Sequence, residues 1–174
     1  MYFILSILIC IRAYDWSPLE QVMKEGIGEH AFPGGVIIVG NATHTIFEQS
    51  YGHYTYQKDI YEVPVTTDTK YEIASLTKVM ATTLAIMNLV SSNSISVDDQ
   101  VSKYVQNYDT NKKGNTTIKN LLLHNAGLPF DSPHPLPATP ADVIDYIRFL
   151  KPIYPVGSQF TYSDLGFLLL GKIV

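Results

Sequence analysis

The chain has 174 residues, of which 46% are hydrophobic and 16% are charged, and its formal net charge is −4. This is the composition of an ordinary globular protein, and it provides neither a basic stripe for nucleic acid nor a polybasic anchor for a membrane. The single cysteine, Cys10, excludes an internal disulfide and cysteine catalysis. The length permits one domain with a sizeable core, or part of a larger domain.

An apolar run at residues 3–11 opens the chain and is about as long as the core of a secretory signal peptide. Ala13 is a small residue of the kind that precedes a cleavage site, so we predict a signal peptide at residues 1–13 and a mature chain at 14–174. No basic residue precedes the run, and Arg12 follows it. An ordinary N-terminal strand or an uncleaved anchor therefore remains the alternative.

Two glycosylation acceptor patterns, at Asn41 and Asn115, lie in predicted loops and favour the secretory route. We expect a secreted protein or one in the secretory-pathway lumen, with no stable membrane span beyond the N-terminal segment. The sequence leaves the oligomeric state open.

The first half of the mature chain is predicted to hold one helix and an antiparallel strand pair. Ser17 as N-cap, Pro18 at the first position and Glu20 closing a capping box predict the helix start. The apolar run at residues 36–39 predicts a strand covered on both faces, and residues 45–51 its partner.

An uncharged segment from Val79 to Val90 follows an irregular stretch. Apolar residues recur there at three- and four-residue steps and also fill the other side, which predicts a central, buried helix. At about a dozen residues this helix is too short to span a bilayer.

The second half is predicted to contain short helices joined by loops. Residues 97–104 predict a short surface helix, and the adjacent Lys112 and Lys113 are expected to be solvated in a polar loop. Thr117 is predicted to cap one further helix, and Thr139-Pro140-Ala141-Asp142 to start another. The apolar segment after Tyr162 predicts a last one.

Ser75 and Lys78 stand three residues apart where the apolar helix begins, so they share one face with β carbons roughly 5–6 Å apart. The helix dipole and burial both push Lys78 toward its neutral form, which can take a proton from a serine hydroxyl. Lowering its pKa from about 10.4 to 7–8 requires roughly 4 kcal/mol, so a further partner is needed. The alternative is a chance match in which Lys78 extends from a core helix to solvent.

Three features occur in one order: Ser75-Leu76-Thr77-Lys78, a helix end at residues 121–129, and Tyr162-Ser163-Asp164. Together they resemble the serine β-lactamase and penicillin-binding-protein superfamily, most closely the branch with AmpC-type β-lactamases, D-aminopeptidases, D-Ala-D-Ala carboxypeptidases and related esterases. The resemblance covers about residues 33–174. It implies an α+β fold, with an antiparallel sheet flanked by helices plus a helical lobe.

The resemblance also implies a serine hydrolase that acts on a peptide, β-lactam or small ester through an acyl-Ser75 intermediate. Ser75 is expected to be the nucleophile and Lys78 its proton acceptor. Tyr162 is expected to hold Lys78 and to pass a proton to the leaving group. No cofactor is implied, and the five histidines show no metal-ligand spacing, so we expect no metal.

Asp164 is the expected substrate-binding position, but the family usually has asparagine there. A carboxylate accepts a hydrogen bond from Lys78 and cannot donate one to a substrate carbonyl. It also stabilises charged Lys78, which opposes the required fall in its pKa. The substitution disfavours β-lactam turnover more than ester hydrolysis.

His124 permits a catalytic-triad interpretation, but its place at a helix end matches a structural turn of the family. We expect a capping or packing role. The family completes its oxyanion hole with a later strand bearing Lys or His, a third residue and Gly, and no such triplet follows Tyr162. Losing one oxyanion donor typically costs about 100- to 1,000-fold in rate.

We therefore expect the N-terminal part of such a domain, truncated before the C-terminal strands and inactive by itself. The alternatives are a non-catalytic truncated relative retained for binding, or an incomplete gene product. A small-molecule or peptide substrate is implied, and its identity stays open.

Overall fold

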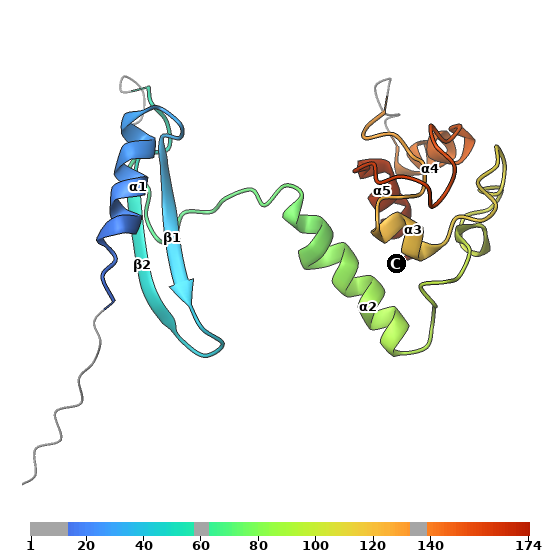
Figure 1. Ribbon diagram of the computed structural model, residues 1–174, viewed down its shortest axis with the longest axis horizontal. Helices are drawn as coiled ribbons and strands as arrows, with labels where there is room; N and C mark the ends of the chain where they lie inside the picture. Colours follow the sequence, from blue (N-terminus) through green and yellow to red (C-terminus); the bar gives the residue numbers. More distant parts are fainter. Residues whose placement is uncertain (1–13, 58–62, 133–138) are drawn as a thin grey trace, which may run out of the picture. The chain divides into compact units, whose positions relative to one another are not determined.

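The computed structural model describes residues 14–57, 63–132 and 139–174 (Figure 1). The predicted signal peptide lies outside these residues. The chain divides between Tyr71 and Glu72 into two compact units. Within the described ranges, every helix is too short or too polar to cross a membrane.

The first unit is a helix lying along a strand hairpin (Figure 1). Helix α1 spans Ser17–Gly28, and strands β1 (Gly34–Gly40) and β2 (Thr45–Gly52) pair antiparallel. The predicted strand pair is thus confirmed. Within this unit, one helix and one partner strand leave Ile38 exposed, so the first unit by itself does not cover β1 on both faces as the sequence predicts.

The start of α1 corrects the predicted cap by one residue. Trp16 occupies the N-cap and makes no side-chain cap, whereas Ser17 is already helical. The Ser17 backbone N–H donates to Asp15 Oδ1 at 3.0 Å. Glu20 pairs with Lys24 at 3.3 Å rather than closing a capping box.

The second unit begins with the predicted apolar helix. The chain turns at Ala74 and Ser75, passes through a π-helical segment at Lys78–Thr82, and continues as α2 at Thr83–Ser91.

The second unit by itself does not give this helix the full burial that its sequence predicts. Of the residues of α2 only Ile86 is buried. Five large apolar residues are left exposed by this unit, namely Leu76, Val79, Met80, Leu84 and Met87. The sequence pattern indicates what a helix is able to bury, and the second unit covers only one side of this helix.

The core of the second unit is built by three helices, α3 (Ile118–Leu122), α4 (Pro140–Phe149) and α5 (Asp164–Ile173), which gather together in Figure 1. The predicted N-cap Thr117 is confirmed, and the predicted start of α4 is confirmed with Thr139 as its N-cap; each side chain accepts a backbone N–H. Apolar residues of these helices and of the preceding loop form one cluster, including Ile118, Leu121, Ile147, Leu165 and Leu169.

The predicted surface helix at residues 97–104 is only a short 3-10 turn, η2 (Val101–Lys103). Its first residue, Val101, is completely buried in the core cluster, and the backbone there is anchored by a hydrogen bond from Val101 N–H to Thr116 O at 2.9 Å. Anchoring against a distant segment ends the helix early.

Lys113 is buried, contrary to its expected solvation. Its Nζ donates to the backbone oxygens of Ile147 at 3.1 Å and Arg148 at 2.5 Å, and it lies 4.5 Å from the Tyr108 ring centroid. Burial lowers the pKa of Lys113 to about 8. The ammonium group thus satisfies carbonyls at the end of α4, where the helix dipole favours a positive charge.

We expect Lys113→Met to lower the free energy of unfolding by about 1–3 kcal/mol, because buried carbonyl oxygens lose a donor. Urea unfolding followed by circular dichroism measures this change. The matched control is Lys112→Met, which removes an exposed neighbour and is expected to be nearly neutral. Equal stability of the two variants would contradict a structural role for Lys113.

Candidate active site

Ser75 and Lys78 meet at the start of the apolar helix, as their spacing predicts. Lys78 Nζ donates to Ser75 Oγ at 3.3 Å, and the Lys78 backbone N–H donates to Ser75 O at 3.0 Å. Ala74, directly before the serine, has a φ of 42°, which is strained for a residue with a β carbon. Such strain concentrates at functional sites.

A π-helical segment starting at Lys78 is a feature that the sequence did not predict. The Thr83 backbone N–H donates to Lys78 O, five residues back, in place of the usual four. π-Helical turns inside α-helices often occur at functional sites. No residue type marks such a turn in advance, so no signal in the sequence identifies it.

The second half of the site comes from the start of α5. Lys78 Nζ forms an ion pair with Asp164 Oδ1 at 2.6 Å and lies 5.1 Å from the ring centroid of Tyr162. Ser163 is buried as the N-cap of α5, with its Oγ accepting from Gly166 N–H at 3.3 Å. The structure therefore brings together all four residues predicted for the site.

The charges in the site favour an ionised lysine. Burial lowers the pKa of Lys78, but hydrogen bonds with Asp164 and Tyr162 and their charges outweigh it, and the net pKa is raised. This confirms the expected effect of Asp164. It also runs against Lys78 as the neutral proton acceptor in the free protein.

Tyr162 shows the complementary change. Hydrogen bonding to Ser75, followed by hydrogen bonding to Lys78, lowers the pKa of the Tyr162 hydroxyl. A phenol beside an ammonium group loses its proton more easily than a free tyrosine does. Tyr162 is thus the group in this site best suited to accept a proton from Ser75.

His124 has the packing role that was expected from the sequence. It follows the end of α3, its Nδ1 accepts from the Ser163 backbone N–H at 2.9 Å, and its ring stacks on Tyr162 at 4.5 Å between centroids. The Nδ1 lone pair is already engaged, so the structure does not support a triad in which that atom is the base.

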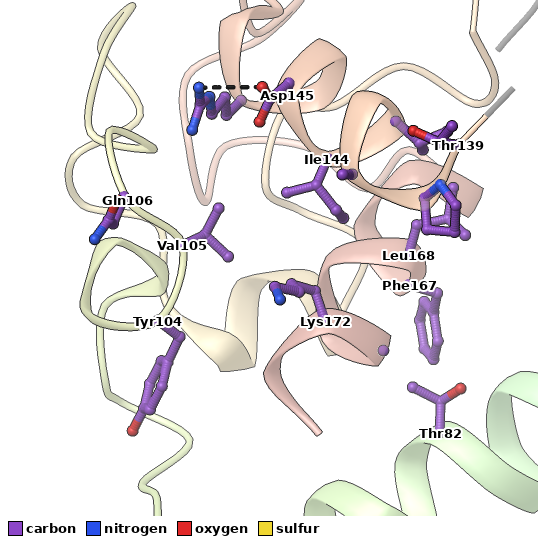
Figure 2. A pocket seen from close by; sticks show the side chains of 15 residues that line it. Thr82, Tyr104, Val105, Gln106, Thr139, Ile144, Asp145, Phe167, Leu168 and Lys172 are labelled. Atoms are coloured by element: carbon purple, nitrogen blue, oxygen red, sulfur yellow. Dashed lines mark ion pairs between the residues drawn. The ribbon is translucent and has the colours of Figure 1, made fainter. Parts of the chain in front are cut away.

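A groove of about 1000 Å³ lies elsewhere on the second unit. Figure 2 shows Ile144, Phe167, Leu168 and Lys172 around it. Its lining residues do not include the four residues of the candidate site. The chemistry-bearing cluster therefore lies outside this groove.

The two glycosylation candidates lie away from the site. Asn41 is exposed in the turn between β1 and β2, where its Oδ1 accepts from the backbone N–H groups of Thr43 and His44 at 2.9 Å. Asn115 is exposed in the loop before α3. Glycosylation at either residue stays a prediction.

A lysine that contacts a serine three residues before it, with a tyrosine from a second segment beside them, is the arrangement that the resemblance implies. The chain belongs to the Beta-lactamase family, whose family model matches residues 19–174. The predicted membership and the predicted β-lactamase/transpeptidase-like α+β fold are both confirmed.

Three relatives illustrate this membership. A putative D-alanyl-D-alanine carboxypeptidase from Escherichia coli K12 is 35% identical over 126 residues, covering 64% of this chain and 29% of the relative. An octameric penicillin-binding protein homologue from Pyrococcus abyssi has a TM-score of 0.77 at 30% identity, over 92% of this chain and 38% of that one. A class C β-lactamase from Rhodobacter sphaeroides has a TM-score of 0.72 at 27% identity, over 88% and 42%. The chain thus spans less than half the length of each.

Proposed function

We propose that the protein is a serine hydrolase that cleaves an ester or amide bond through an acyl-Ser75 intermediate. The observation that carries this proposal is the position of Lys78 Nζ, 3.3 Å from Ser75 Oγ and 2.6 Å from Asp164 Oδ1, beside the ring of Tyr162. Such an arrangement holds a serine hydroxyl against a fixed positive charge and a phenol of lowered pKa.

In the acylation step, Ser75 Oγ attacks the substrate carbonyl carbon and its proton passes to the Tyr162 phenolate. Tyr162 then gives this proton to the leaving oxygen or nitrogen as the bond to the carbonyl carbon breaks. Lys78 stays protonated throughout and stabilises the phenolate whenever it forms.

Deacylation reverses the same transfers. Tyr162 takes a proton from a water molecule, the resulting hydroxide attacks the acyl carbonyl carbon, and the proton returns to Ser75 Oγ as the ester bond breaks. Tyr162 thus serves as base and acid in turn, and Lys78 keeps its positive charge through both steps.

Asp164 favours small esters or peptides over β-lactams as the substrate class. Its carboxylate is held by Lys78 and has no hydrogen to donate to a substrate carbonyl. The similarity to a putative D-alanyl-D-alanine carboxypeptidase supports a peptide as an alternative to an ester.

Burst kinetics with p-nitrophenyl acetate test the proposal. We expect up to one nitrophenolate per chain to be released rapidly as Ser75 is acylated, followed by slow turnover. Ser75→Ala is expected to abolish the burst, and Ser91→Ala, at the far end of the same helix, to retain it. A burst that survives in Ser75→Ala would overturn the assignment of the nucleophile.

Asp164→Asn is expected to move the rising limb of the pH–acylation profile to lower pH. The Asp164 charge raises the pKa of both Lys78 and Tyr162, so its removal favours the phenolate. Because the interaction is half-exposed the effect is small, and we expect acylation about two- to fivefold faster at pH 7. Stopped-flow burst rates between pH 5 and 9 measure the shift, and a limb that moves to higher pH would contradict it.

A further inference from the structure

His124 binds the backbone on both sides of Tyr162. Its carbonyl oxygen accepts from Thr161 N–H at 2.8 Å, and its Nδ1 accepts from Ser163 N–H at 2.9 Å. One residue thus holds the peptide group between Phe160 and Thr161 and the peptide group between Tyr162 and Ser163. Hydrogen bonds in these two places restrict the backbone dihedrals that aim the Tyr162 side chain.

The His124 ring also supports the Tyr162 side chain directly. The two rings stack with centroids 4.5 Å apart and an interplanar angle of 29°. On the same imidazole, Phe167 of α5 stacks at 5.0 Å and Phe160 meets it edge-on at 5.8 Å. The tyrosine ring therefore rests on an imidazole that is itself held between aromatic neighbours.

The backbone of His124 is left-handed, with a φ of 54°. Outside glycine this conformation is uncommon, and asparagine, aspartate and histidine adopt it more readily than other residues do. An ordinary capping role would not require a ring at this position. The ring is used in this structure for contact with Ser163 and Tyr162.

The imidazole must be neutral to do this. Nδ1 accepts a hydrogen bond only when it carries no proton, so the ring proton belongs on Nε2. Burial first, and then the positive charge of Lys78, lower the pKa of His124, while the charge of Asp164 opposes this. Lys78, Asp164 and Tyr162 are the titratable groups packed around the ring.

We propose that His124 is a positioning residue: its neutral imidazole holds the Thr161–Ser163 backbone and the Tyr162 ring so that the phenol stands beside Ser75 and Lys78, and protonation of the imidazole releases them. This inference rests on the proposed function for its effect on rate. The geometry that it describes is testable without any reaction.

Two variants separate the hydrogen bond from the stacking. His124→Phe keeps an aromatic ring and removes the Nδ1 acceptor. His124→Asn keeps an acceptor oxygen close to the Nδ1 position, tolerates the left-handed backbone and cannot titrate. His44→Asn, in the hairpin turn of the first unit, is the matched control for the substitution itself.

The rate measured is that of Ser75 modification by a fluorophosphonate in the full chain, from pH 4.5 to 9. We expect His124→Phe to slow it on the order of 10- to 100-fold, the size expected for a misplaced catalytic group. His124→Asn is expected to recover most of this loss at neutral pH, and His44→Asn to match the unmodified chain.

The acid side of the same profile distinguishes positioning from simple packing. In the unmodified chain the logarithm of the rate falls with slope one while Tyr162 is protonated, and with slope two once His124 is protonated as well. His124→Asn is expected to keep slope one throughout. Slope two in His124→Asn, or a normal rate in His124→Phe, would overturn the proposal.

Nuclear magnetic resonance of the unmodified chain provides a test that depends on neither activity nor variant folding. We expect the His124 nitrogen shifts to show Nε2–H and an accepting Nδ1 at neutral pH, and the Tyr162 ring signals to change as His124 titrates. The positioning role would be refuted if His124 were protonated at pH 7, or if the Tyr162 ring signals did not change as His124 titrates. If Ser75 stays unmodified while Tyr162 still follows His124, the proposed function fails and the positioning role stands.

Discussion

Tyr162→Phe is expected to slow acylation of Ser75 by about 100- to 10,000-fold, the range for removing a positioned general base. The phenyl ring keeps its stacking on His124 and its contact with the Lys78 ammonium, so only the hydroxyl is lost. Lys78 cannot replace the hydroxyl as acceptor of the Ser75 proton, because the pKa of Lys78 is raised. The fluorophosphonate modification rate, followed by intact mass, measures the loss.

The pH dependence of the Ser75 modification rate identifies the base more directly than the size of the rate loss does. The unmodified chain is expected to react faster as pH rises through the lowered pKa of Tyr162, whereas Tyr162→Phe is expected to lose this limb. Tyr154→Phe, in the loop that precedes α5, is the matched control and is expected to react like the unmodified chain. If the modification rate of Tyr162→Phe still rose with pH in the same range, the general base would be a residue other than Tyr162.

Lys78→Met is expected to slow acylation by about 100- to 1,000-fold, the cost of removing one preorganised charge from an active site. The Lys78 ammonium group lowers the pKa of Tyr162 through its hydrogen bond and its charge. It also donates to Ser75 Oγ at 3.3 Å. Without it the phenol titrates at higher pH and the serine loses its orientation. The modification rate and its pH midpoint are measured together.

Lys78→Arg is the control for charge alone. It keeps a cation near Asp164, but its planar fork cannot reproduce the single-point contacts of an ammonium group. We expect partial activity with a midpoint close to that of the unmodified chain. Because Asp164 is half-exposed, we expect either substitution to change stability by under about 1 kcal/mol. A Lys78→Met chain that reacts at the normal rate would contradict the proposed mechanism.

Local features of the site were predictable because they depend on residues close in sequence. The three-residue spacing of Ser75 and Lys78 fixes their contact in any helical turn. The caps at Thr117 and Thr139 depend on the next three residues only. The contact of this helix with Tyr162 and Asp164, nearly ninety residues on, has no local signal, and it was predicted only through the resemblance to a known family.

Features set by distant partners were missed. Lys113 was expected in solvent because its neighbours are polar, yet its partners are backbone carbonyls at Ile147 and Arg148. The burial expected for the apolar helix also needs distant partners, since the second unit by itself covers only one side of this helix. The π-helical segment depends on backbone hydrogen bonding that no side chain encodes.

The most direct test of the central claim is the intact mass of the full chain after treatment with a fluorophosphonate, with peptide mapping of the adduct. We expect one adduct per chain, located on Ser75 and absent from Ser75→Ala. An adduct on another residue, or one that persists in Ser75→Ala, would contradict the acyl-enzyme assignment. No adduct at any pH between 5 and 9 would instead support a non-catalytic role for this chain.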